Sequence, residues 1–341
     1  MRTLLLSYLL IIGYNALHAQ SIRMLTSGHN TSIRGLSAPD EHVVWASGSN
    51  GQIGRSVDAG EHWTWRVVSG FEKTDFRDIE AFDSLTAVIM GISEPGHILC
   101  TSDGGRSWQL VYADSSKGVF MDAMHFQRNG KGIVVGDPID GKLYAVLTSD
   151  YGRNWKRIDP AILPALANGE AFFASSGGNV LQFKSGAFGA VTGGLRSRWL
   201  TPTEHVVLPL QQGRQSTGAN AVAAGDKGLL VAVGGDFSND KRTDSTCAIS
   251  KDAGKTWQHP VTGLNGYRSS VTSFGKGRFI ACGTSGVDMS SDGGMHWKSI
   301  STEGFHVCAP SGQGKKVYMA GSKGRIAVLE GLPLNKRGAK D

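Results

Sequence analysis

The stretch Ser56-Val57-Asp58-Ala59-Gly60-Glu61-His62-Trp63 decides the fold, because its pattern returns four more times along the chain. The template reads Ser or Thr, any residue, Asp, any residue, Gly, any residue, then a small polar residue or His, then Trp. A template with so many fixed points does not recur by chance, so the chain is built from repeats. The template residues are Asp58, Gly60 and Trp63; Asp103, Gly105 and Trp108; Asp150, Gly152 and Trp155; Asp252, Gly254 and Trp257; and Asp292, Gly294 and Trp297.

Each copy has the composition of a hairpin turn. The Asp carboxylate can accept hydrogen bonds from backbone N–H groups inside the turn. The Gly permits a positive φ, and the Trp begins the next strand with a large apolar surface. We therefore interpret these Asp residues as structural rather than catalytic.

The pattern resembles the Asp-box, or BNR, repeat of sialidases, sortilin-type receptors, some glycoside hydrolases and the photosystem II stability/assembly factor-like proteins. The resemblance covers nearly the whole chain after residue 19, and it implies a β-propeller. It says little about function, because one fold hosts many functions.

Two series of residues give the number of blades. The Asp residues of successive boxes are 45, 47, 102 and 40 residues apart. The long interval predicts a hidden repeat, and we interpret Arg196-Ser197-Arg198-Trp199 as a copy that keeps the Trp without the Asp and Gly. New apolar strands begin at seven places, and the second residue of each start is Arg34, Arg77, Met121, Glu170, Asn220, Arg268 or His306.

The sequence therefore predicts an all-β, seven-bladed β-propeller over residues 20–332. The last blade has no box and lacks an outer strand at the C-terminal end. Residues 21–25 precede the first strand start, so we expect them to supply that outer strand and close the ring. Residues 333–341 form a polar tail in this interpretation.

The first 19 residues are predicted to be a signal peptide. Arg2 precedes a short apolar run, and the small residue Ala19 offers a cleavage site. The run is too short for a comfortable membrane span, and no later segment is apolar enough to provide one. The expected location is periplasmic or extracellular.

Composition excludes several classes of protein. Hydrophobic residues make up 40% of the 341 residues and charged residues 19%, which is typical of a globular chain. The 47 glycines show no three-residue period, so the chain is not collagen-like. The formal charge is +6, or +5 without Arg2, and no run of Lys or Arg indicates nucleic-acid binding. We expect a monomer.

The sequence indicates no metal and no cofactor. The four cysteines form no CxxC pair, and no GxGxxG after a strand, CxxCH or flavin motif is present. Cys282 and Cys308 fall in neighbouring repeats, so either a disulfide or two buried thiols is compatible with the sequence.

The candidate ligand-binding residues lie at the strand starts, around the top mouth of the central channel, and in the linkers nearby. Guanidinium groups suit carboxylates and phosphates, although Arg and Asp side chains at a channel mouth can also pair with each other and bind nothing. The candidate residues are Arg34, Arg77, Asp122, Asp137, Glu170, Asp236, Arg268 and His306.

We prefer the interpretation of an exported binding or assembly scaffold, which holds a protein or an anionic or carbohydrate ligand at this mouth. Resemblance to the photosystem II stability/assembly factor-like group implies a basic patch that receives a membrane-protein precursor, for which Arg34, Arg77 and Arg268 are candidates. The alternative is a glycoside hydrolase. A sialidase-like clamp would use the same three arginines, although Arg34-Gly35-Leu36 departs from that family's Arg-Ile-Pro signature.

A different glycosidase would need two carboxylates across a cleft. The sequence offers four for this role, without indicating which pair is used, so enzymatic activity stays an open alternative. These residues are Asp78, Asp122, Asp137 and Glu170.

Overall fold

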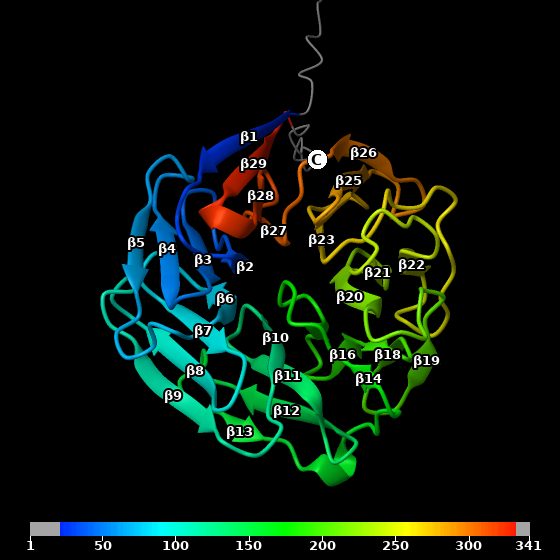
Figure 1. Ribbon diagram of the computed structural model, residues 1–341, viewed down its shortest axis with the longest axis horizontal. Coiled ribbons are helices and arrows are strands. Elements are labelled where there is room, and N and C mark those ends of the chain that lie inside the picture. Colours follow the sequence, from blue (N-terminus) through cyan, green and yellow to red (C-terminus); the bar gives the residue numbers. More distant parts are fainter. Residues whose placement is uncertain (1–20, 332–341) are drawn as a thin grey trace, which may run out of the picture.

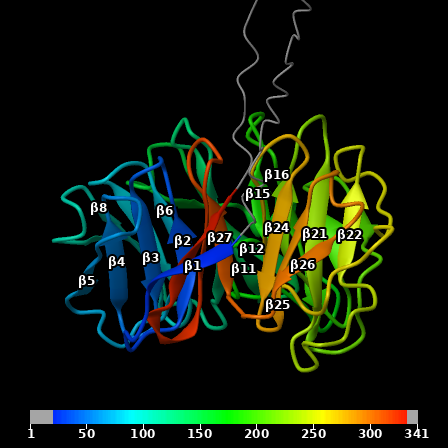
Figure 2. The same ribbon diagram turned by 90° about the horizontal axis from the view of Figure 1, so that it is seen from above.

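The computed structural model describes residues 21–331, which are almost entirely β-structure. Seven antiparallel sheets surround a central channel (Figure 1), and their strands run along the axis of the ring (Figure 2). This arrangement confirms the predicted seven-bladed β-propeller. The predicted signal peptide (1–19) and polar tail (333–341) lie outside the described residues.

The first three blades are regular four-stranded meanders. Blade 1 comprises β2 (Ile33–Ser37), β3 (Val44–Gly48), β4 (Gln52–Ser56) and β5 (Thr64–Val67). Blade 2 comprises β6 (Phe76–Ala81), β7 (Ala87–Gly91), β8 (Gly96–Thr101) and β9 (Gln109–Asp114). Blade 3 comprises β10 (Met121–Phe126), β11 (Gly132–Ile139), β12 (Lys142–Thr148) and β13 (Lys156–Arg157).

Blades 4 and 5 are less regular, and a short helix, η1 (Pro160–Ile162), precedes them. Blade 4 comprises β15 (Val180–Gln182), β16 (Phe188–Val191), β18 (Arg198–Leu200) and β19 (His205–Val207). Blade 5 comprises β20 (Thr217–Ala224), β21 (Leu230–Asp236) and β22 (Cys247–Ser250). Two short strands extend the blade 5 sheet at its inner edge, β14 (Glu170–Ala171) and β17 (Gly193–Gly194).

The N-terminal strand closes the ring, as predicted. Blade 6 comprises β23 (Ser270–Ser273), β24 (Phe279–Gly283), β25 (Gly286–Ser290) and β26 (Lys298–Ser301). Blade 7 comprises β27 (Val307–Pro310), β28 (Val317–Ala320), β29 (Ile326–Glu330) and β1 (Ser21–Thr26), with a short helix η2 (Ser322–Gly324) between β28 and β29. Antiparallel pairing of β1 with β29 joins the two ends of the described chain (Figure 1).

The core consists of apolar layers between neighbouring blades. Seven buried clusters are present in residues 21–331, and each draws its side chains from two adjacent blades. The innermost strands also contact one another around the channel. The blades therefore stabilise each other in a ring, and no blade buries its apolar faces alone.

All five sequence boxes form a turn after the third strand with the same hydroxyl, carboxylate and backbone hydrogen bonds, and in three of them the Trp indole also donates to the carbonyl of the box Gly. In the first box, the Ser56 hydroxyl donates to Asp58 Oδ1 at 2.8 Å, and the amide of Gly60 donates to Ser56 Oγ at 2.9 Å. The amide of His62 donates to Asp58 Oδ1 at 2.9 Å, and the indole of Trp63 donates to the Gly60 carbonyl. These bonds satisfy the polar groups of a tight turn locally, which is the structural role expected of the motif.

The box glycine also sets the spacing between blades. Gly60 has φ of +92°, and a side chain there would collide with Leu25 of blade 7. In the same way, Gly105 faces Trp45 of the preceding blade. The turn thus needs Gly both for its backbone conformation and for close approach of the neighbouring blade.

One sequence interpretation is wrong. Trp199 is not the Trp of a degenerate box, because it lies within β18, the third strand of blade 4, and is fully buried. Its indole packs instead against Gly254 and Trp257 of the next box. The residue thus supports the box of blade 5, while the turn that follows β18 has neither the Asp nor the Gly of the template.

The four cysteines are free thiols. Cys282 and Cys308 are close neighbours, as their places in adjacent repeats suggested, and burial raises the pKa of Cys282, as does its hydrogen bond with Cys308.

We predict that Asp252→Ala lowers the unfolding temperature at neutral pH. Hydrogen bonds from the side chain and backbone of Thr256 lower the pKa of Asp252 to about 2. A carboxylate whose pKa is lower in the folded than in the unfolded protein stabilises the fold. This stabilisation is complete above the unfolded pKa of about 4 and is lost as pH falls toward 2. Thermal melts should therefore differ most at neutral pH and converge in acid. A temperature gap that persists at pH 2, or one matched by the exposed Asp226→Ala control, would contradict this role.

Removing β1 should open the ring. A chain that starts at residue 27 loses the ladder with β29 and the contacts of Ile22 and Leu25 with two core clusters. We expect it to be less stable by about 3 kcal/mol than a chain that starts at Ser21, from the lost apolar burial. Urea unfolding of the two chains measures this difference, and equal midpoints would show that closure does not stabilise the fold.

Candidate functional site

The channel is lined by innermost strands that share an irregularity near their first residues. In β2, β6, β10 and β20 the pairing register shifts by one residue. A bulge of this kind takes the extra residue out of the ladder and re-aims its side chain. The extra residues are Arg34, Arg77, Asp122 and Asn220.

A segment that leads into blade 4 crosses the channel at the level of these bulges. We call residues 173–178 the plug. Arg77 Nη1 donates to the carbonyl of Ala174 and Arg34 Nη1 donates to the carbonyl of Ser175, both at 3.2 Å. The Ser175 hydroxyl donates to Asn220 Oδ1 at 3.0 Å. On the blade 6 side, the Ser176 hydroxyl donates to the carbonyl of Ser269 at 2.7 Å. Contacts with four blades close the channel at the end where the innermost strands begin.

Arg34 and Arg77 lie at this closed mouth, as the sequence predicted. Arg34 is half-buried; burial, and then the charge of Arg77, lowers its pKa. Within residues 21–331 Arg34 forms no ion pair, whereas Arg77 Nε is 2.8 Å from Asp75 Oδ2. Burial and the nearby Arg34 also lower the pKa of His306 to about 4. The mouth therefore presents unneutralised positive charge.

Arg268 does not join this mouth, which corrects the sequence prediction. It is 0% exposed, and its Nη2 is 2.6 Å from Asp288 Oδ2 in a buried ion pair. The amide of Arg268 donates to the carbonyl of Gly234 in blade 5, and the amide of Met121 donates in the same way to the carbonyl of Ile92 in blade 2. Arg268 and Met121 therefore occupy equivalent places, each one residue before the bulge. The positions at the channel are therefore Asp122 and Ser269, one residue later than the sequence pattern suggested. Arg34, Arg77 and Arg268 form no three-arginine clamp.

Glu170 is also misplaced in the sequence interpretation. The innermost strand of blade 4 begins at Val180, ten residues later. Glu170 is buried and accepts hydrogen bonds from Arg198 Nη2 at 2.6 Å, Arg198 Nε at 2.8 Å and the Thr192 hydroxyl at 2.6 Å. With its oxygens satisfied inside the protein, it holds the lead-in to blade 4 and is not available to a ligand.

The other predicted acidic residues support loops near the plug. Asp137 accepts from the amide of Phe172 at 2.9 Å, and the buried Asp236 accepts from the amide of Ser238 at 2.9 Å. Asp122 is fully buried, and burial and then the charge of Asp137 raise its pKa well above the usual range. The backbone amides of Asp137 and Ala174 lie near the carboxyl and reduce this rise in pKa. Neither amide is placed to form a regular hydrogen bond with Asp122. These residues are not exposed ligands.

A cavity of about 870 Å³ occupies the channel on the other side of the plug. It is lined by the second halves of the innermost strands and by the turns that follow them, so it opens on the face that carries the boxes. Ser176, Gly177 and Gly178 of the plug line its inner end. The sequence interpretation placed ligands at the opposite mouth and missed this cavity.

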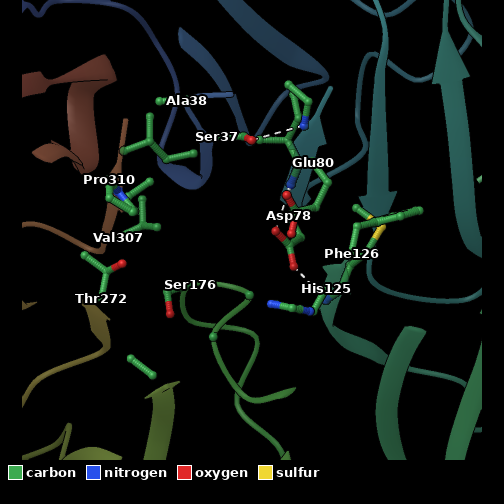
Figure 3. Close-up of a pocket in the computed structure, with 18 of the residues that line it drawn as sticks. Ser37, Ala38, Asp78, Glu80, His125, Phe126, Ser176, Thr272, Val307 and Pro310 are labelled. Atoms are coloured by element: carbon green, nitrogen blue, oxygen red, sulfur yellow. Dashed lines mark hydrogen bonds between the residues drawn. The ribbon is translucent and has the colours of Figure 1, made fainter. Parts of the chain in front are cut away.

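Three titratable side chains lie on one side of this cavity (Figure 3). Asp78 and Glu80 come from β6 and His125 comes from β10. Burial raises the pKa of Asp78 to about 7, and burial together with the charge of Asp78 raises the pKa of Glu80 to about 8. Burial lowers the pKa of His125 to about 4. The sequence signal that could have indicated this cluster is the spacing of Asp78 and Glu80, because residues two apart on a strand point to the same side.

Comparisons with known proteins give the fold but no family. No family model and no curated protein matches the chain. A structure of YCF48 bound to D1 peptide is 19% identical, with TM-score 0.62, covering 91% of this chain and 94% of that one. YCF48 from Cyanidioschyzon merolae is 15% identical, with TM-score 0.64 and coverage of 90% and 98%. The WD40 β-propeller domain of Doa1 is 12% identical, with TM-score 0.60 and coverage of 91% and 97%.

No helix in residues 21–331 is long and apolar enough to cross a membrane.

Glu80→Gln should change how stability depends on pH. A carboxyl whose folded pKa is raised stabilises fully below the unfolded pKa of about 4, and this contribution is lost as pH rises toward 8. Glutamine has no proton to lose, so we expect the variant to gain on the order of 2 kcal/mol over the wild type between pH 4.5 and pH 8. Urea unfolding at the two pH values measures the gain. An identical difference at both would show that Glu80 is not held neutral by burial.

Proposed function

We propose that this chain is an exported binding scaffold that holds a partner polypeptide by a carboxylate at Arg34 and Arg77. The observation that carries the proposal is the pair of neighbouring guanidinium groups at the plugged mouth, of which Arg34 has no carboxylate partner within residues 21–331. Export rests on the apolar N-terminal stretch and stays part of the proposal.

The two arginines have hydrogen-bonding capacity to spare. A guanidinium carries five N–H donors, and Arg34 uses one of them, on the Ser175 carbonyl. Burial and mutual repulsion disfavour its charge in the free protein. A ligand carboxylate would neutralise Arg34, the arginine without an ion pair, and use its remaining donors, and charge-assisted bonds of this kind are stronger than neutral ones.

An aromatic pair beside the plug favours a polypeptide over a small anion. Phe173 of the plug contacts Phe237 edge-on, with ring centroids 5.5 Å apart. Phe237 is 49% exposed, which is unusual for a large aromatic side chain. Exposed aromatics next to charged groups suit protein partners. The structurally similar YCF48 has been solved with a peptide bound, and this supports the same class of ligand here.

The test uses a library of short peptides, each made with a free C-terminal carboxylate and again with a C-terminal amide. We expect the free acids to bind the wild type, and Arg34→Ala to weaken that binding at least about tenfold, because a hydrogen bond to a charged group contributes on the order of 1.5–3 kcal/mol. Fluorescence anisotropy gives the affinities.

The matched control is Arg196→Ala, which removes an exposed arginine on blade 4. It should bind peptides as the wild type does, and all three proteins should melt at similar temperatures. Equal binding of acids and amides, or equal losses in both variants, would contradict a carboxylate site at Arg34 and Arg77.

A further inference from the structure

We propose that the cavity on the box side is a second binding site, which takes a primary ammonium group carried on an apolar stem. A lysine side chain and a free alkylamine share this chemistry. The site lies on the other side of the plug from Arg34 and Arg77, so the inference does not depend on the function proposed above.

The shape of the cavity is that of a blind pocket. The plug residues Ser176 and Gly178 line its inner end, while Pro39 and Arg128 belong to turns at its opening. Its volume of about 870 Å³ lies within the range of small-molecule sites and far exceeds the space of a few ordered waters. A ligand would therefore enter end-on from the box face and stop at the plug.

One side of the pocket carries two carboxyl groups that have no cation. Asp78 and Glu80 are two residues apart on β6, so both face the channel. Asp78 accepts from the amides of Ile79 and Met124 at 2.8 and 2.7 Å. Neither carboxyl forms an ion pair with a Lys, Arg or His within residues 21–331. An isolated buried carboxylate is costly, and a cation beside it removes much of that cost.

His125 lies beside the carboxyls as a neutral group that can donate a hydrogen bond to an oxygen but accepts none from an ammonium group, so the two carboxyls would hold the ligand. Its Nδ1 accepts a hydrogen bond from the amide of Gln182 at 3.2 Å, which places the ring proton on Nε2. A neutral imidazole adds no positive charge that would repel an ammonium group. Figure 3 shows His125 and Asp78 on the same side of the pocket.

The facing wall combines apolar side chains with the hydroxyl groups of Ser270, Thr272 and Ser273, so it can pack against the hydrocarbon stem of a ligand. Val222, Val271, Val307 and Pro310 come from blades 5, 6 and 7 and line the pocket opposite β6. An ammonium group at Asp78 and Glu80 would thus be attached to a chain that runs along hydrocarbon, as a lysine stem does.

The lining argues against the two other simple occupants. A metal ion needs several ligating side chains, and the described residues contain no group of three or more His, Cys, Asp or Glu that could hold one. An anion would meet two carboxyls inside the pocket. Arg128, at the rim, is turned toward blade 7, where its Nη2 donates to the carbonyl of Gly312 at 3.1 Å.

The experiment titrates the wild-type protein with pentylamine and with a lysine tripeptide, followed by calorimetry. Pentanol and the same tripeptide acetylated on the lysine side chain are the neutral counterparts. We expect the amines to bind at least tenfold more tightly than their counterparts. Binding by pentylamine alone would indicate a small amine and binding by the tripeptide a polypeptide lysine, and both outcomes support the ammonium site. Failure of both amines to bind, or equal binding of the neutral compounds, overturns it.

Glu80→Gln locates the site, with the exposed Glu204→Gln on blade 4 as its matched control. We expect the first variant to lose at least tenfold in amine affinity and the second to bind as the wild type does. Equal affinities in the two variants would overturn the assignment. Arg34→Ala should leave amine binding unchanged, which separates this result from the carboxylate site.

Discussion

Two main-chain carbonyls, of Ala174 and Ser175, accept hydrogen bonds from Arg77 and Arg34, and the organisation of the channel depends on this contact. The contact holds the plug across the channel at the level of these two arginines. In this position the plug divides the channel into a cationic mouth on one face and a blind pocket with two carboxyls on the other. The seven innermost strands thus line two surfaces, one with arginine side chains and the other with carboxyl groups.

The plug can hold this position because the ring around it is rigid. Apolar layers join every blade to its neighbours, and β1 joins the last blade to the first part of the chain. The boxes fix the outer turns through hydroxyl, carboxylate and backbone hydrogen bonds, and the Gly of each box lets the adjacent blade approach closely. The inner bulges then aim Arg34 and Arg77 at the axis, where the plug meets them.

The sequence was sufficient to predict the seven blades, but it was insufficient to predict which side chains face the channel. Five boxes and seven apolar starts predicted the blades, because these features repeat with regular spacing. The bulges leave no such signal, so Arg268 was placed one residue from the channel position that Ser269 occupies. The insertion before β15 made Glu170 resemble a strand start, although it is a partner of Arg198. Glu80 and His125 were missed because their importance comes from burial beside a cavity that only the closed ring creates.

The central claim is that the plug separates two independent sites, and a competition titration tests it most directly. The protein is saturated with pentylamine and then titrated with a peptide that carries a free C-terminal carboxylate. The account predicts the same peptide affinity with and without the amine, because the plug lies between the two ligands. Mutual displacement, with the peptide affinity falling as amine is added, would show a single continuous site and contradict the account.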